Sequence, residues 1–413
     1  MVPVIWQRRP EVAIVGAGLF GLVVAEHLTR LTPGLRVQIT EASSRIGGLC
    51  VSDIDPRTGV SFHPHGTNVL ATSDRQVWAY VRSRTTAVEL RPRAYTSYNG
   101  ALLPMPLGLE AIEACFGAPL TPEQARRLVK ADAAEHQCQP PATAEQAALA
   151  ALGPRLYEAF VRGLLAKQWG DPTTVTADVF TDHFTLRYAP TAEDTGARWQ
   201  GLPGGGWGPM LDRLTEHRGI SVVLNHRASA ADPPPFSRAC VVTSPIDHWF
   251  GQDLGALERR RTTIDWRLVP AAQAPARGTV TYPDPDLPYY RTHTPALLGA
   301  AGAGPQLPGR RRALLVGFER ADCAPVGRCG VHQADVTLRT PRNRALADTY
   351  LSRAAAQRQL TASGDPRVWF AGRGTGSHDD MGTTIAAALR LAETLARELA
   401  ARTPPPGSRA SWV

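Results

Sequence analysis

The chain has almost no lysine, no long hydrophobic run and no cluster of cysteines. Only Lys130 and Lys167 are lysines, so arginine supplies nearly all of the 45 basic residues behind the formal net charge of +8. The arginines form no stripe interleaved with aromatic residues, which argues against a nucleic-acid surface, whereas their planar guanidinium groups suit phosphate. No apolar stretch approaches the roughly 18 residues that span a membrane, and residues 1–10 lack the pattern of a signal peptide. We therefore expect a soluble, cytoplasmic protein with no membrane or nucleic-acid partner.

The cysteines lack the spacing of a disulfide framework or a zinc site. They are Cys50, Cys115, Cys138, Cys240, Cys323 and Cys329. Scattered cysteines in a chain of 413 residues are typical of a reducing compartment, so we expect free thiols. Cys323, Cys329 and His332 lack the paired Cys-x-x-Cys elements of a zinc site, and a loop is the simpler interpretation. We predict no metal.

The N-terminal region has the pattern of a dinucleotide-binding unit. Its parts are an apolar strand at 12–15, the turn residues Gly16, Gly18, Leu19, Phe20 and Gly21, a helical segment, a second strand at 36–40, and Glu41. In such a unit the glycines permit a tight turn, close approach to a pyrophosphate and packing of the helix, and the acid binds a ribose hydroxyl. Residues 45–48 resemble an extension of glutathione-reductase-type FAD proteins. We therefore predict FAD as the cofactor, with Arg45 and Gly48 among its contacts.

The chain is long enough for two or three packed units, because single cores stop growing at about 250–300 residues. We expect an α/β protein with a discontinuous, Rossmann-like FAD-binding domain, a helical insertion domain and an antiparallel β-sheet domain. The predicted limits are 1–75, 203–262 and 366–402 for the FAD-binding domain, 76–170 for the helical domain, and 171–202 with 263–365 for the sheet domain. A mobile loop is expected near 183–197 and a disordered tail at 403–413.

At this point the chain resembles the UDP-galactopyranose mutase family. The resemblance rests on motifs in the right order over most of the chain, at residues 16–21, 45–48, 167–170, 200–206, 244–247, 255–258, 288–291, and 372–373 with 380–381. Amine-oxidase-like flavoproteins would share only the first one or two. The family interconverts pyranose and furanose rings of a nucleotide sugar. The resemblance implies that N5 of reduced FAD attacks the anomeric carbon and displaces the nucleoside diphosphate, and that the flavin–sugar adduct opens and recloses without net redox change.

The resemblance also implies roles for individual residues. Arg291 matches the arginine that binds the diphosphate, and Trp169 matches the tryptophan that lines the sugar pocket. Phe160 falls where an aromatic ring stacks on the nucleobase. For Trp169 and Phe160 an ordinary core position is the alternative. The cofactor-side positions are His63 near the flavin, Arg373 near the FAD pyrophosphate, and Asp380 and Met381 at the turn into the last helix.

Several positions depart from the family pattern. His183 stands where the family has a second, loop-borne arginine, with Arg187 four residues later and Arg198 as another candidate to compensate. Gly66, Thr67 and Asn68 replace a Gly-x-His turn beside the flavin. Tyrosines expected at Leu164, near 338–341 and near 377–378 are absent from the sequence.

These changes rewrite the substrate half of the site and leave the cofactor half intact. Loss of several ligand partners together implies a different ligand. We therefore expect an isomerase, a flavoprotein that acts on a nucleotide sugar other than UDP-galactose. An alternative is an FAD-dependent oxidoreductase that transfers hydride with a small anionic metabolite, and a third is a flavin-binding protein without catalysis. The family resemblance is compatible with a homodimer.

Overall fold

The computed structural model describes residues 10–189, 196–298, 313–321, 331–360, 367–372, 375 and 380–401. Several sequence predictions lie outside these residues. They are Arg373, the positions near 377–378, Cys323 and Cys329, part of the loop near 183–197, and the tail at 403–413. No helix among the described residues is long and apolar enough to cross a membrane.

A parallel sheet forms the first layer. Its strands run in the order β10 (Ile220–Val223), β2 (Val37–Thr40), β1 (Val12–Val15), β11 (Ala239–Val242) and β17 (Arg367–Phe370). Every pairing in it is parallel. β1 and β11 are short, wholly buried apolar runs, as expected for central parallel strands. The strands come from widely separated parts of the chain, so the predicted α/β, Rossmann-like and discontinuous fold is confirmed.

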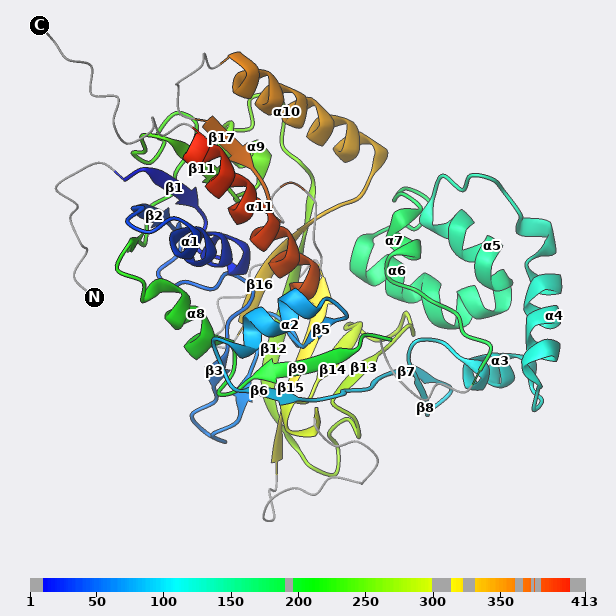
Figure 1. Ribbon diagram of the computed structural model, residues 1–413. Helices are drawn as coiled ribbons and strands as arrows, with labels where there is room; N and C mark the ends of the chain where they lie inside the picture. Colours follow the sequence, from blue (N-terminus) through cyan, green and yellow to red (C-terminus); the bar gives the residue numbers. More distant parts are fainter. Residues whose placement is uncertain are drawn as a thin grey trace, which may run out of the picture.

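Helices cover both faces of this sheet (Figure 1). On one face α1 (Leu19–Leu31), α8 (Trp207–Thr215) and α11 (Met381–Ala401) share one apolar core with the strands. On the other, α9 (Ile246–Trp249) and α10 (Pro341–Leu360) contribute to a second core. The strand order reverses between β1 and β11, and open α/β sheets bind ligands at such a point, outside the carboxyl ends of the strands.

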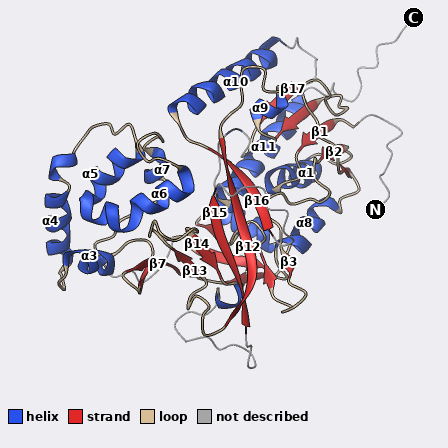
Figure 2. Cartoon of the chain, turned by 180° about the vertical axis from the view of Figure 1, so that it is seen from behind, coloured by secondary structure: helices blue, strands red, loops and turns tan. Residues whose placement is uncertain are grey.

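A larger sheet lies in the middle of the molecule (Figure 2). Its order is β16 (Val331–Thr337), β12 (Arg259–Pro270), β15 (Ala313–Ala321), β14 (Arg291–His293), β13 (Thr279–Thr281), β7 (Ala94–Tyr98) and β8 (Ala101–Pro104). Neighbours are antiparallel except β13 and β7. Strands β12 to β16 come from residues 259–337, most of them within the segment 263–365 expected to contribute to an antiparallel sheet.

A group of helices stands to one side of both sheets (Figure 1). It contains α3 (Leu109–Phe116), α4 (Pro122–Asp132), α5 (Ala144–Leu156), α6 (Arg162–Trp169) and α7 (Asp178–Thr181), which share one apolar core. Local sequence explains where α4 and α5 begin. Thr121 and Thr143 each form a capping box with the glutamine three residues later. A π-helical turn at Tyr157–Val161 joins α5 to α6.

The segment 76–170 is less uniformly helical than its composition suggests. Helix α2 (Arg75–Arg82) packs into the core of the parallel-sheet layer, and β7 and β8 extend the large sheet. β6 (Ala87–Glu89) pairs with β9 (Trp199–Pro203), which also pairs with β5 (Leu70–Thr72). A further hairpin joins β3 (Asp53–Ile54) and β4 (Ser61–Phe62). These short strands have distant partners, which a local pattern does not reveal, and the exact domain limits stay predictions.

Candidate functional site

The glycine turn after β1 has the geometry that a dinucleotide needs. Gly16 has a φ of +106°, and a Cβ there would lie 2.3 Å from Thr243 Oγ1. A Cβ on Gly21 would lie 2.1 Å from the Gly16 carbonyl oxygen, so this glycine lets α1 pack against the turn. A Cβ on Gly18 would meet no described atom within 4 Å. The backbone at Gly18 is therefore open to a ligand, at a helix N-terminus that no described side chain caps.

Glu41 and the loop at 45–48 border this turn. Glu41 follows β2, and its Oε2 accepts a hydrogen bond of 2.8 Å from the Ala17 amide. The amide of Gly47 donates to the Ala17 carbonyl at 2.7 Å, and a Cβ on Gly48 would be 3.3 Å from Gly18 Cα. The residues predicted from separate motifs thus meet around one turn. The guanidinium of Arg45 is bonded instead to Asp53, at 2.9 and 3.1 Å.

The start of α11 reaches the same region. Asp380 caps the helix, because its Oδ1 accepts from the Thr383 amide at 2.8 Å. Met381 Sδ lies 3.8 Å from the thiol of Cys50, two residues past Gly48. At the end of β17, a Cβ on Gly372 would lie 3.2 Å from Phe20 Cγ, which places this strand end against the first helix. The chain therefore brings its predicted cofactor residues from both ends of the sequence together.

The turn at 63–68 lies between the loop at 45–48, which we call the cofactor loop, and the large sheet. His63 is buried, and its Nδ1 accepts from the Asn68 amide at 2.9 Å. The Asn68 side chain donates to the Leu49 carbonyl at 2.9 Å, directly after the 45–48 loop. Burial, and then the nearby His293, lower the pKa of His63 to about 4, so the ring is neutral at pH 7. The neutral His63 ring therefore stabilises this turn through its hydrogen bond with the Asn68 amide.

Arg291 belongs to a buried polar cluster on β14 and β15. The register places Arg291 opposite Glu319, and Nη1 lies 3.3 Å from Glu319 Oε2. The same carboxylate accepts from Tyr290 at 2.8 Å and from His293 Nε2 at 2.9 Å. Burial would raise the pKa of Glu319, but Arg291 and His293 outweigh it and lower the pKa to about 2. The Arg291 side chain is 31% exposed, so part of its donor fork stays available to an anion.

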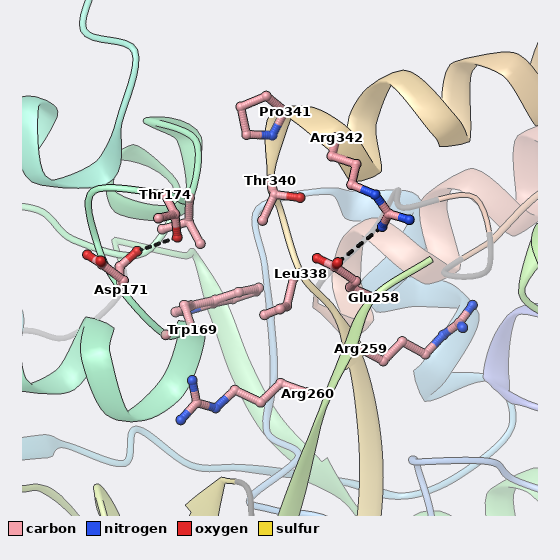
Figure 3. Close-up of a pocket in the computed structure, with 12 residues that line it drawn as sticks. Trp169, Asp171, Thr174, Glu258, Arg259, Arg260, Leu338, Thr340, Pro341 and Arg342 are labelled. Carbon is pink, nitrogen blue, oxygen red and sulfur yellow. Dashed lines mark hydrogen bonds and ion pairs between the residues drawn. The ribbon is translucent and has the colours of Figure 1, made fainter. Parts of the chain in front are cut away.

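Trp169 lines a cavity of about 580 Å³ between the helices and the large sheet (Figure 3). Leu338, Thr340 and Pro341 form the opposite wall. In the view of Figure 3, Arg260 extends beneath the indole ring, while Arg259 points away from it. Although Trp169 is 6% exposed and part of the helical core, it faces this cavity, so the core position and a substrate-lining position are compatible.

Helix α6 holds Trp169 in a fixed relation to the strand that carries Arg291. Lys167 Nζ donates to the carbonyl oxygens of Tyr282 at 3.0 Å and Tyr289 at 3.2 Å, and also to that of Asp284. One turn earlier, a Cβ on Gly163 would lie 1.7 Å from the Pro283 carbonyl oxygen. The loop 282–289 is therefore fastened directly to α6 just before β14 begins.

The positions predicted to replace the missing arginine have different surroundings. The His183 ring lies 5.5 Å from the Trp169 ring, and its Nδ1 donates to the Val179 carbonyl at 2.9 Å. Arg187 continues the segment beside α3, where its amide donates to the Leu107 carbonyl at 2.8 Å. Arg198 lies over the ring of Trp199, on β9. Of these predicted groups, His183 is thus the one with a described contact to Trp169.

Phe160 occupies the alternative, core position. It is 1% exposed, lies in the helical core, and its ring centroid is 5.0 Å from that of Tyr98. Stacking on a base would require this ring to leave its core, so the structure favours packing over base recognition. Leu164, at the position of a family tyrosine, is also buried.

Sequence reasoning missed four residues of the site. Arg339 lies 5.7 Å from the Trp169 ring and is bonded to Asp182 at 2.6 Å. Arg260 extends below the same ring, and Glu319 and His293 hold Arg291. The runs around 259–261 and 338–342 are rich in arginine, which was the available signal. For Glu319 the cross-strand register was needed.

Two family models match parts of this chain. A model of the NAD(P)-binding Rossmann-like domain matches residues 14–83, and a model of the UDP-galactopyranose mutase family matches residues 159–297, which include both Trp169 and Arg291. A protein of Klebsiella pneumoniae described as a probable UDP-galactopyranose mutase is 27% identical over 94% of both chains. The chain is thus similar to the UDP-galactopyranose mutase family. The relatives named mutases are enzymes of the isomerase class.

A second relative and a solved structure are also similar to this chain. The dTDP-fucopyranose mutase of Escherichia coli is 27% identical over 289 residues, 68% of this chain and 75% of that protein. The fold matches the crystal structure of a reduced UDP-galactopyranose mutase with a TM-score of 0.69 at 14% identity, covering 95% and 96% of the two chains. The chain is therefore similar to mutases named for different nucleotide sugars.

Proposed function

We propose that this chain is a flavin-dependent sugar-nucleotide mutase that interconverts pyranose and furanose forms of a nucleotide sugar other than UDP-galactose. The observation that carries the proposal is the pairing of two sites. A dinucleotide turn at Gly16–Gly21 lies at one side, and a cavity lined by Trp169 and arginine lies next to the sheet that carries Arg291.

The proposed cofactor is FAD in its reduced form. The open face at Gly18, the uncapped start of α1 among the described residues, and the carboxylate of Glu41 fit a pyrophosphate and a ribose. When bound, reduced FAD would supply a nucleophile at N5 for an isomerisation in which no electrons are gained or lost overall.

The chain's own residues would hold the leaving diphosphate. Arg291 is anchored by Glu319 and keeps a donor edge exposed, so it can neutralise charge that develops when the bond to the sugar breaks. Arg260 and Arg339 approach Trp169 from elements β12 and the segment before α10. We propose that they supply the positive charge of the family's second arginine and the hydrogen-bond donors of its tyrosine pair.

The altered positions favour another substrate. Leu164 and His183 cannot reproduce the hydrogen bonds of the tyrosine and the arginine that they replace. A relative named dTDP-fucopyranose mutase acts, by its name, on a nucleotide sugar with a different base and sugar. We therefore propose a deoxynucleotide or deoxysugar substrate as the first class to test.

The test is turnover without an electron acceptor. Flavin-loaded protein, reduced with dithionite under anaerobic conditions, is incubated with UDP- and dTDP-linked hexoses and deoxyhexoses, and the products are separated by chromatography. We expect one substrate to equilibrate with a ring isomer of equal mass. A requirement for a stoichiometric acceptor, with a product changed by two mass units, would instead support the oxidoreductase alternative.

Arg291→Ala is the matched variant for this assay. Removing the guanidinium from the leaving diphosphate should lower kcat/KM by about 100-fold or more, which is about 3 kcal/mol of transition-state stabilisation. Arg267→Ala, on the neighbouring sheet surface with an exposed side chain, is the control and should stay near wild type. Equal activity of the two variants would remove Arg291 from the proposed site.

A further inference from the structure

A row of four hydrogen-bonded side chains leads from the turn at 63–68 to Arg291. The hydroxyl of Thr67 lies 2.8 Å from His293 Nδ1, and His293 Nε2 lies 2.9 Å from Glu319 Oε2. That same oxygen is 3.3 Å from Arg291 Nη1. His293 is 2% exposed and Glu319 is 7% exposed, so the interior part of the row is shielded from water.

The strands explain why these side chains meet. Side chains two apart on a strand point to the same face, so Arg291 and His293 both reach the face on which Glu319 lies. Opposite His293 the partner strand has Gly317, which adds no side chain to compete for the space. Thr292, between them, points to the other face, where its hydroxyl lies 3.4 Å from that of Tyr282.

Donor and acceptor types give the row a direction. The carboxylate of Glu319 only accepts, so Nε2 of His293 carries a proton. The Thr67 hydroxyl lies at hydrogen-bond distance from Nδ1, so both ring nitrogens of His293 are bonded. Thr67 thus fixes the ring orientation of His293. Glu319, bonded by His293 and Tyr290, has little freedom left beneath Arg291.

We propose that His293 is a positioning residue for Arg291, that it acts through Glu319, and that Thr67 orients it. The row ties the anion-binding arginine to the turn at 63–68, and Asn68 bonds this turn to Leu49 beside the cofactor loop. The inference rests on the proposed function only in taking Arg291 as an anion contact. Thr67 is separated from Arg291 along the row by His293 and Glu319. Loss of its hydroxyl should nevertheless weaken anion binding.

Inorganic pyrophosphate is the probe, titrated calorimetrically into the flavin-loaded protein. Thr67→Val removes the hydroxyl at nearly constant volume, and Thr67→Ser restores it. We expect Thr67→Val to raise the Kd by about fivefold, the equivalent of one net hydrogen bond, and Thr67→Ser to return it to near the wild-type value. The matched control is Thr292→Val. Thr292 is a buried threonine on β14, between Arg291 and His293, and its side chain points to the other face of the sheet, so this variant should bind pyrophosphate as the wild type does.

The histidine itself is tested by two substitutions. His293→Gln keeps a donor near the Nε2 position and loses the partner of Thr67, whereas His293→Asn keeps an amide near Nδ1 and loses the bond to Glu319. We expect His293→Asn to raise the Kd more than His293→Gln does. We also expect Thr67→Val to have no further effect on the Kd in an Arg291→Ala background, because the row then has no guanidinium to position.

Two results would overturn the inference. One is an unchanged Kd in Thr67→Val and His293→Asn while Arg291→Ala binds weakly; the other is an effect of Thr67→Val that persists undiminished in Arg291→Ala. If pyrophosphate binds equally to wild type and Arg291→Ala, the anion role of Arg291 in the proposed function fails. Urea unfolding of wild type, Thr67→Val, Arg291→Ala and the double variant then tests whether the two side chains are coupled. Additive changes in the unfolding midpoint would reject the coupling, and non-additive changes would support it.

Discussion

Two buried ionisable side chains of the site, His63 and Glu319, have displaced pKa values. Both shifts are downward, to about 4 for His63 and to about 2 for Glu319. In each case the unfolded chain binds a proton at a higher pH than the folded chain does. Stability is therefore lost as the pH falls, between about 6.5 and 4 through His63 and between about 4.5 and 2 through Glu319.

His63→Asn should flatten the first of these losses. Asn keeps an oxygen that can accept from the Asn68 amide but has no proton to gain. We expect the wild-type free energy of unfolding to fall by about 3 kcal/mol more than that of the variant between pH 7 and 4, measured by urea unfolding. His136→Asn, at an exposed position, is the control. Parallel pH curves for wild type and His63→Asn would contradict this account.

The glycines of the cofactor turn make separable predictions. Gly21→Ala places a Cβ 2.1 Å from a carbonyl oxygen, so we expect it to destabilise the fold by about 2 kcal/mol or more. Gly18→Ala meets no described atom, so we expect the apoprotein to keep its stability within about 1 kcal/mol while its affinity for FAD falls at least about tenfold. Thermal unfolding and FAD titration of both variants measure the two effects. Equal FAD affinity for Gly18→Ala and wild type would exclude close approach of the cofactor.

These residues also mark how far single positions can be predicted from sequence. The three glycines and Glu41 were predictable, because strand, turn and helix are consecutive and each glycine has a local steric task. Glu319 was not, because it meets Arg291 across a sheet and follows it by 28 residues. His293 was equally hidden, since its partners are at positions 67 and 319. Non-local register, rather than residue type, carries this information.

Helix α6 and the loop at 282–289 act as one element. Lys167 donates to three loop carbonyl oxygens in a half-buried setting, and burial lowers the pKa of its ammonium group. This lysine lies two residues before Trp169 and the loop ends two residues before Arg291. The motif at 167–170 was predictable as a substrate element, but its grip on the loop was not, because backbone carbonyl partners leave no trace in sequence.

Lys167→Met should loosen this junction. The variant leaves loop carbonyl oxygens without their donor, so we expect a loss of about 2 kcal/mol in the free energy of unfolding and weaker pyrophosphate binding. Lys130→Met changes the one other lysine of the chain, at an exposed position on α4, and should do neither. Urea unfolding and calorimetry check both variants. A Lys167→Met protein as stable as Lys130→Met would show that the loop does not depend on this contact.

At the scale of the whole molecule, elements with a continuous local sequence pattern could be predicted, whereas strands with distant partners could not. The two strands predicted at 12–15 and 36–40, on either side of the glycine turn, are present as β1 and β2. The strands inside 76–170 were missed because β6, β7 and β8 pair with β9 and β13, more than 100 residues away, or with one another. The helices around them gave the segment its composition. The resemblance predicted a pocket at Trp169, but its other walls could not be foreseen, because the cavity forms where α6, β12 and the segment before α10 converge.

We propose that flavin and sugar become covalently joined during the isomerisation. The most direct measurement is mass spectrometry of flavin recovered from dithionite-reduced protein after incubation with a panel of nucleotide sugars and quenching with cyanoborohydride. The account predicts a flavin heavier by one reduced sugar residue with one member of the panel, and much less of it in Arg291→Ala. Unmodified flavin alone, from a sample in which the same nucleotide sugar is being turned over, would contradict it.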